Sequence, residues 1–89
     1  MKAVVTVVGE DKIGIIAGVS AVLAECDANI MDISQTILQD YFTMMMLVDL
    51  SKVGMSLEEL KAQLQQTGQD LGVSIQIQHE DLFRSMHRI

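Results

Sequence analysis

The spacing of apolar residues along this chain changes twice from the strand period of two to the helix period of about 3.6, and each time it changes back. Two segments, residues 14–26 and 56–71, carry apolar side chains at every third or fourth position, as amphipathic helices do. Four further segments have the β-branched content or the alternation of strands, and they are residues 3–8, 30–38, 42–50 and 73–78. The predicted order is therefore β-α-β-β-α-β.

This order predicts an α+β fold of the ferredoxin-like type. Right-handed crossovers arrange such a chain as a four-stranded antiparallel sheet with two helices on one face. A chain of 89 residues can form one such core but not two. We expect the domain to occupy residues 1–79, followed by a short amphipathic C-terminal helix at residues 80–89.

Local signals support the second helix. Ser56 and Glu59 have the spacing of a capping box, and Gly72 is placed as a C-terminal cap. Gly68 lies inside the helix, where glycine costs about 1 kcal/mol relative to alanine unless close packing requires it.

The second and third strands are predicted to form a hairpin. Met31, Ile33 and Ile37 alternate with polar residues, which predicts a half-buried strand with these three side chains on one face. The tight turn is expected at Gln39-Asp40, because aspartate tolerates left-handed conformations. In the third strand, the even-numbered side chains are expected to face the core.

The sheet face without helices is predicted to be apolar. Val4, Val8, Met45 and Leu47 would all lie on it, and a monomeric protein rarely leaves such a patch bare. We therefore expect the C-terminal helix or a second subunit to cover this face, and we predict a homodimer.

Charge and cysteine content restrict the partners and the compartment. The formal net charge of −6 disfavours nucleic-acid binding, because a negative field repels phosphate. The single cysteine, Cys26, falls on the apolar face of the first helix and is expected to be an inert core residue in a reducing compartment. The sequence shows neither a signal peptide nor an apolar run of about 20 residues, so we expect a cytoplasmic protein without membrane contact.

Other functions known for ferredoxin-like domains require residues that this sequence does not have at the relevant positions. RNA recognition needs exposed aromatic residues on the third strand. The outward positions of that strand are Thr43, Met45, Leu47 and Asp49. The first loop has neither the Cys-x-x-Cys of a metallochaperone nor the arginine of an acylphosphatase, and the group His79, Glu80, Asp81 and His87 fits no standard metal-ligand spacing. We therefore expect no metal, no cofactor and no arranged nucleophile and base.

The first loop and the start of the second strand carry a more specific pattern. The loop reads Gly-Glu-Asp-Lys-Ile-Gly-Ile from Gly9 to Ile15, and the second strand begins with Asn29-Ile30. Across residues 4–78 the chain resembles the ACT family of small amino-acid-sensing domains, in which such a loop precedes an Asn-Ile pair. Ile13 stands where proline is common in that family, which leaves the loop less rigid. The chain is also similar to the ACT halves of the glycine-cleavage repressor and of formyltetrahydrofolate deformylase.

The resemblance implies a non-catalytic regulatory module that dimerises and binds a small ligand, above all an amino acid. The loop leads into a helix N-terminus, where free N–H groups attract a carboxylate. The ligand ammonium would meet Asp11 or Asp32, and Asn29 and Ile30, from the same chain or from a partner, would close the site. The expected ligand-binding residues are Asp11, Lys12, Ile13, Gly14, Ile15, Asn29, Ile30 and Asp32.

Several of these residues also have a purely structural interpretation. Asp11 would serve equally well as an N-cap, and Gly14 as a packing residue at the helix start. Asn29 would serve as a left-handed helix terminator, and Lys12 as a solvated surface residue. The alternative function is accordingly a structural dimerisation module that binds no ligand. An enzyme acting on a small acyl or phosphate substrate ranks third.

Overall fold

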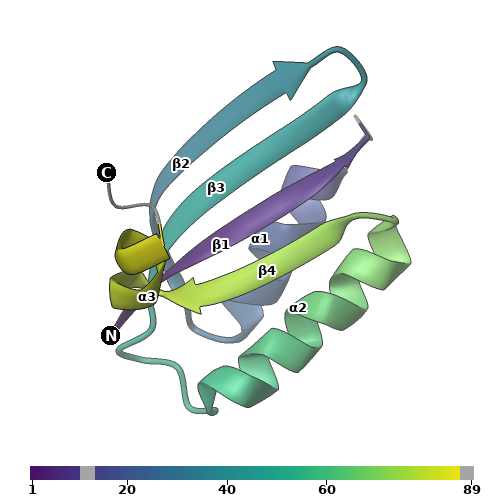
Figure 1. Ribbon diagram of the computed structural model, residues 1–89. Coiled ribbons are helices and arrows are strands. Elements are labelled where there is room, and N and C mark those ends of the chain that lie inside the picture. Colours follow the sequence, from purple (N-terminus) through teal and green to yellow (C-terminus); the bar gives the residue numbers. More distant parts are fainter. Residues whose placement is uncertain (11–13, 87–89) are drawn as a thin grey trace.

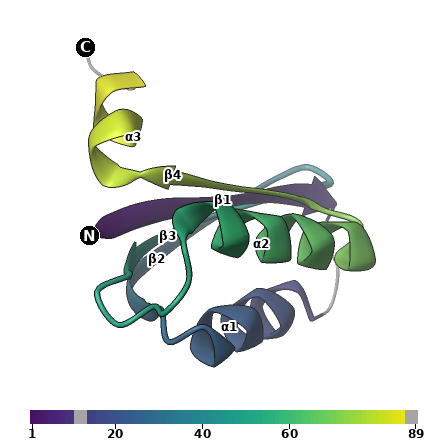
Figure 2. The same ribbon diagram turned by 90° about the horizontal axis from the view of Figure 1, so that it is seen from below.

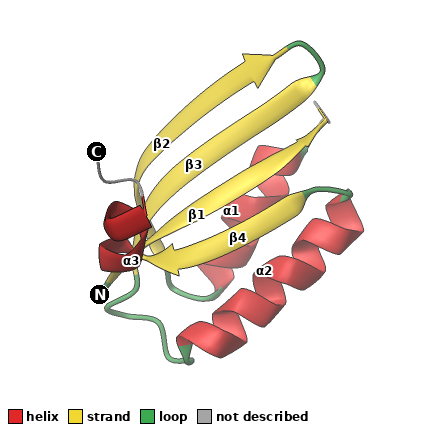
Figure 3. Cartoon of the chain, viewed as in Figure 1, coloured by secondary structure: helices red, strands yellow, loops and turns green. Residues whose placement is uncertain are grey.

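The strands form one antiparallel sheet in the order β2-β3-β1-β4, with α1 and α2 on one face (Figures 1 and 2). The computed structural model describes residues 1–10 and 14–86. Its elements are β1 (Lys2–Glu10), α1 (Ile15–Glu25), β2 (Asn29–Leu38), β3 (Tyr41–Asp49), α2 (Leu57–Leu71), β4 (Ser74–His79) and α3 (Glu80–Met86). Figure 3 shows these helices and strands, and the predicted βαββαβ order with a C-terminal helix is confirmed.

The core lies between the sheet and the two helices. Residues that pair directly across strands share a face of the sheet, and Val5 lies between Met46 and Ile77 in one such buried row. The even-numbered residues of β3 face this core as predicted, and they are Phe42, Met44, Met46 and Val48. The fully buried side chains that the helices contribute are Val19, Leu23, Leu60 and Leu64.

Helix α2 begins and ends at the predicted caps. The Oγ of Ser56 accepts a hydrogen bond from the N–H of Glu59 at 3.1 Å, and Gly72 adopts a φ of 73° after the last turn. A Cβ at Gly68 would lie 2.7 Å from the carbonyl oxygen of Val73. Close packing between α2 and the chain entering β4 therefore requires this glycine, which explains its place inside a helix.

Helix α1 ends in a Schellman motif built around Asp27. The N–H of Asp27 donates to the carbonyl of Ala24 at 3.1 Å, and the N–H of Ala28 donates to the carbonyl of Leu23 at 2.9 Å. Asp27 has a φ of 61°, a left-handed conformation that glycine adopts more easily. The helix terminator is thus Asp27, and Asn29 already belongs to β2.

Strand β2 differs from the prediction in burial and in register. It is an edge strand that only α1 contacts from the helical layer, so most of its side chains are exposed and the expected half-buried strand is wrong for a single chain. In the pairing of β2 with β3, Met31 has no partner and forms a β-bulge. Ile33 and Ile37 pair with the core-facing residues Met46 and Phe42, so Met31 does not share a row with them as predicted. In the turn, Gln39 and not Asp40 has the positive φ, at 54°.

The outer face of the sheet carries the predicted apolar patch. Val4 is buried, Met45 and Leu47 are half-buried, and Val8 is exposed. Helix α3 stands on this side at the end of β4, where it packs against β1 and β4 (Figure 2). No residue of α3 from Glu80 to Met86 is buried, and Leu82 and Met86 are exposed, so a single chain does not bury this helix against the sheet. Within the described residues, no helix is long and apolar enough to cross a membrane.

Candidate functional site

The two halves of the predicted ligand site lie at opposite ends of the sheet. At one end Asn29, the first residue of β2, pairs with Asp49, which also pairs with Lys2. At the other end Glu10, the last residue of β1, precedes the loop to α1. Strand β1 has nine residues, so its ends are about 26 Å apart at about 3.3 Å per residue. A single chain therefore does not bring Asn29 and Ile30 to the first loop.

The first half of the site centres on the N-terminus of α1. Asp11, Lys12 and Ile13 lie outside the described residues. Gly14 is the N-cap of α1 with a φ of 91°, and no side chain among the described residues caps the helix there. A Cβ on Gly14 would meet no atom of the described residues within 4 Å, and the positive φ is what favours glycine there. Ile15 is buried in the core, and only its backbone remains for a ligand.

The second half of the site is the start of β2. Asn29 is exposed, whereas Ile30 is half-buried and packs against the core. Asp32 is exposed, and its Oδ1 accepts a hydrogen bond from the N–H of Ile33 at 2.9 Å. This end of β2 therefore exposes the amide of Asn29 and the carboxylate of Asp32, whereas Ile30 packs against the core.

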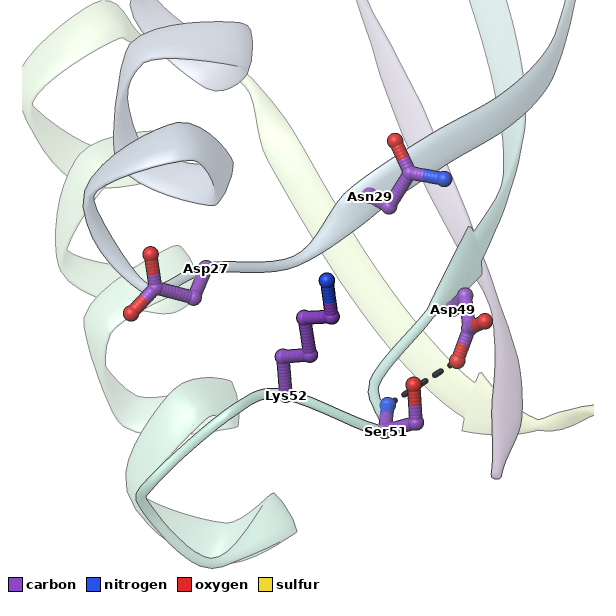
Figure 4. A pocket seen from close by; sticks show the side chains of 5 residues that line it. All are labelled: Asp27, Asn29, Asp49, Ser51 and Lys52. Carbon is purple, nitrogen blue, oxygen red and sulfur yellow. Dashed lines mark hydrogen bonds between the residues drawn. The ribbon is translucent and has the colours of Figure 1, made fainter.

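A polar pocket of about 310 Å³ opens beside Asn29. Its lining residues are Asp27, Asn29, Asp49, Ser51 and Lys52. Figure 4 shows the side chain of Lys52 extending toward Asn29, with Asp27 on one side and Asp49 on the other. Of these residues the sequence predicts only Asn29 as a site residue. Asp49 is the last residue of β3, and the other three come from two separate connections whose polar residues follow no spacing pattern.

Hydrogen bonds fix the carboxylate of Asp49 in this pocket. Its Oδ1 accepts from the N–H of Ser51 at 2.9 Å (Figure 4). This backbone bond, a bond from the Ser51 side chain, and the nearby charges of the N-terminus and Lys2 together hold the pKa of Asp49 below its usual value of 3.8. The pocket therefore keeps this negative charge at neutral pH.

Cys26 is a core residue, as predicted. It is 6% exposed, and its Sγ donates to Oε1 of Gln63 at 3.2 Å, which joins α1 to α2. Burial raises the pKa of the Cys26 thiol above its usual value, with Glu25 and Asp27 adding to the effect. A protonated, buried thiol is a poor nucleophile. In the part of the chain that the structure describes, no group of three or more His, Cys, Asp or Glu residues could hold a metal ion.

Comparison with known proteins identifies the family. The family model of the ACT domain matches residues 2–78. A UPF0237 protein from Clostridium acetobutylicum is 58% identical over 89 residues and is covered along its full length. A UPF0237 protein from Methanopyrus kandleri is 57% identical over 88 residues, with 98% of its length covered.

Solved structures agree with this result. An ACT domain protein from Streptococcus pneumoniae has a TM-score of 0.83 and 48% identity, with 98% of each chain covered. A formyltetrahydrofolate deformylase from Pseudomonas putida shares the fold at 11% identity and a TM-score of 0.80, over 91% of this chain and 30% of that one. A candidate glycine cleavage system transcriptional repressor shares it at 24% identity and a TM-score of 0.72, over 89% of this chain and 47% of that one.

Proposed function

Because the chain belongs to the ACT domain family, we propose that it is a non-catalytic regulatory module that forms a homodimer and binds a small ligand, with amino acids as the favoured class. The proposed arrangement places the domain at residues 1–79 and an appended helix at residues 80–89. The observation that carries the proposal is the separation of the two motif halves, because a site that uses both halves requires a second chain.

The exposed edge of β2 supports pairing with a second copy. Ile33 is 40% exposed, Ile37 59% and Leu38 70%, and Tyr41 beyond the turn is 60% exposed. An edge strand of ten residues has unpaired backbone N–H and C=O groups to which another strand can bind. Natural proteins seldom leave a long, apolar edge strand uncovered. We propose that two β2 strands pair antiparallel about a two-fold axis, which would bury these side chains and extend the sheet.

This pairing would rebuild the site between the two chains. Antiparallel β2 strands place the Asn29 end of one strand beside the Leu38 end of the other. In each chain the Leu38 end of β2 lies at the same end of the sheet as Glu10, because Leu38 and Glu10 both pair with Tyr41. The first loop of one copy would then face Asn29 and Ile30 of the other.

The proposed ligand contacts follow from the chemistry of the two halves. The ligand carboxylate would accept hydrogen bonds from the N–H groups of residues 12–15, because a helix N-terminus is electropositive. The ligand ammonium would meet Asp11 or Asp32. Asn29 and Ile30 of the second chain would close the site. The amide of Asn29 would form hydrogen bonds, and Ile30 would contribute apolar packing.

The proposed surroundings are the cytoplasm, without membrane or nucleic-acid contact. The net charge of −6 supports the exclusion of nucleic acids. The buried thiol of Cys26 is suited to a reducing compartment.

Thermal unfolding with a panel of the common amino acids tests ligand binding. A ligand that binds only the folded state adds about 2.7 kcal/mol of stability at 100 times its Kd, which raises the melting temperature of so small a domain by several degrees. The structural dimerisation module is the alternative, since the exposed edge of β2 would be buried in either case. A dimer in light scattering whose melting temperature responds to no amino acid or related carboxylate would favour that alternative.

A further inference from the structure

The outer face of the sheet, on the side away from α1 and α2, has a central area without charged side chains. Residues that pair directly across strands share a face, and two consecutive rows of the outer face are uncharged. One row contains Thr6, Met45, Ser34 and Gln76, and the next contains Val8, Thr43, Thr36 and Ser74. Charged residues make up 20% of the chain, and such residues ordinarily lie on surfaces that remain in water. The centre of a protein interface is instead depleted in them.

Helix α3 adds a raised apolar surface at one end of this face. The N–H of Asp81 donates to Nδ1 of His79 at 3.1 Å, and Nε2 of Gln78 donates to Sδ of Met86 at 3.4 Å, so both ends of the helix are tied to β4. Figure 2 shows α3 on the side of the sheet opposite to α1 and α2. Leu82 is nevertheless 53% exposed and Met86 60%. A single chain thus leaves apolar side chains of α3 in water.

The apolar residues of the outer face are unequally exposed along β1. Val4, which pairs with Gln78, is 9% exposed, whereas Val8, four residues further along the same face, is 41% exposed. Helix α3 follows His79, which pairs with Ala3, so the helix stands at the Val4 end. The raised helix and the exposed valine therefore lie toward opposite ends of one face.

These two ends become neighbours under a two-fold rotation. An axis that lies between two outer faces and runs across the strands reverses the strand direction of the second copy. Helix α3 of each copy then lies beyond the Val8 end of the other sheet. A helix of seven residues is about 10 Å long, and sheets packed face to face are about 10 Å apart. Helix α3 thus fits beside the other sheet without holding the two faces apart.

The area of the face is sufficient for a weak, specific contact. Four strands about 4.8 Å apart and about 26 Å long form a face of about 500 Å². Two copies would bury up to about 1,000 Å² in all, which is near the lower limit for specific interfaces. Association through this face is therefore expected at higher concentrations than pairing through a larger interface would need.

We propose that the outer faces of two copies pack against each other, with the uncharged rows of Thr6 and Val8 in contact and α3 of each copy beside the sheet of the other. A second copy is the occupant that these observations favour, because every copy supplies both the raised helix and the exposed end. The inference does not rest on the proposed function, since it uses neither a ligand nor the β2 edge. Where both interfaces form, their two-fold axes are perpendicular and produce a closed tetramer.

Sedimentation equilibrium of the full chain between about 10 μM and about 1 mM tests the proposal. We expect the wild-type mass to rise above that of a dimer and to approach that of a tetramer. Val8→Glu and Leu82→Glu should each weaken this association at least about tenfold, because each places an unpaired charge in the contact. Both side chains are exposed in the single chain, so both variants should keep the fold, which thermal unfolding checks. Ile16→Glu gives the same charge to a side chain on α1 that is 40% exposed, and it should associate as the wild type does.

Ile37→Lys separates this inference from the proposed function, because it places a charge on the β2 edge. Its mass should rise from that of one chain to that of two over the same range, through the outer face alone. Edge pairing is judged by the mass at the lowest concentration, and the outer face by the rise above it. A wild-type mass that remains that of a dimer, a rise that Val8→Glu and Leu82→Glu leave unchanged, or a rise that Ile16→Glu abolishes as fully as they do would each overturn the proposal.

Discussion

Asn29 pairs with Asp49 across β2 and β3, at the end of the sheet that lies farthest from Glu10. The pairing separates the Asn-Ile half of the family pattern from its loop half by the length of the sheet. A ligand that contacts both Asn29 and the backbone near Gly14 must therefore contact two chains. The same pairing places Asn29 in a polar pocket that one chain completes.

The β2 edge should control assembly. Ile37→Lys replaces a side chain that is 59% exposed in the single chain with a charge, and charges on edge strands oppose pairing. We expect the wild type to be a dimer and this variant a monomer in light scattering at micromolar concentration. Gln69→Lys, which adds the same charge to the exposed surface of α2, should remain a dimer. A dimeric Ile37→Lys variant would place the interface elsewhere, with the outer face of the sheet next in line.

Gly68→Ala should destabilise the fold. Alanine would gain about 1 kcal/mol in helix propensity, but its Cβ would lie 2.7 Å from the carbonyl oxygen of Val73. Overpacking against backbone costs typically about 1–3 kcal/mol, so we expect a net loss of up to about 2 kcal/mol in urea unfolding. At Gly54, where a Cβ meets nothing within 4 Å, the same substitution should be close to neutral. Equal stability of Gly68→Ala and the wild type would show that α2 can move away from Val73.

Asp27→Gly should stabilise the protein. A left-handed residue with a Cβ costs about 1–2 kcal/mol, and the added freedom of glycine in the unfolded chain offsets about half of the gain. We expect an increase of up to about 1 kcal/mol in the free energy of unfolding. Asp27→Asn should leave stability nearly unchanged, since asparagine tolerates this conformation. A less stable Asp27→Gly variant would mean that the carboxylate itself stabilises the end of α1.

The carboxylate of Asp49 should stabilise the fold at neutral pH and lose that effect in acid. Its pKa is lower in the folded state than the usual 3.8, chiefly because the N–H of Ser51 donates to it. The unfolded chain therefore takes up the proton first, and the contribution disappears as the pH falls through the folded-state pKa. Asp49→Asn should be less stable than the wild type in urea unfolding at pH 7, and the two should converge at an acidic pH below the folded-state pKa of Asp49. A stability difference that is the same at both pH values would contradict this assignment.

Elements whose ends are marked by residues close together in the sequence, such as the caps of α2, could be predicted. The cap at Ser56 and the terminator Gly72 depend on residues near in the chain, and both are confirmed. The sequence left open whether close packing requires Gly68, and the structure shows that it does. The bulge at Met31 could not be predicted, because it depends on the register of β2 against β3. The side chains of β2 are exposed because β2 lies at the edge of the sheet. The alternation of apolar and polar residues is the same whether the apolar face is buried within one chain or only by a second chain, so it did not predict this exposure.

The candidate site was predictable in its parts and not in their arrangement. The loop pattern and Asn29 are visible in the sequence, but β1 and β2 both run antiparallel to β3 and so parallel to each other. The loop after β1 and the start of β2 must then lie at opposite ends of the sheet, a consequence of topology and not of spacing. Lys52 could not be predicted as a neighbour of Asn29, because residues of separate connections that meet only in the folded chain show no periodic pattern in the sequence.

Complementation between two defective chains tests the shared site most directly. Gly14→Asn places a side chain at the start of α1, and asparagine tolerates the positive φ of 91° there better than most residues do. Asn29→Ala removes the amide from the opposite end of the sheet. The ligand should be an amino acid whose binding is lost in Ile37→Lys, so that its site is one that requires the β2 edge.

Each variant alone should bind none of this ligand, because every site in its dimer contains one defect. In an equimolar mixture refolded together, about half of the dimers pair one variant with the other, and each of these has one intact site. Isothermal titration calorimetry should then recover about one quarter of the wild-type stoichiometry at the wild-type affinity. A mixture that binds no ligand, or a single variant that binds with the wild-type stoichiometry, would contradict a ligand site shared between two chains.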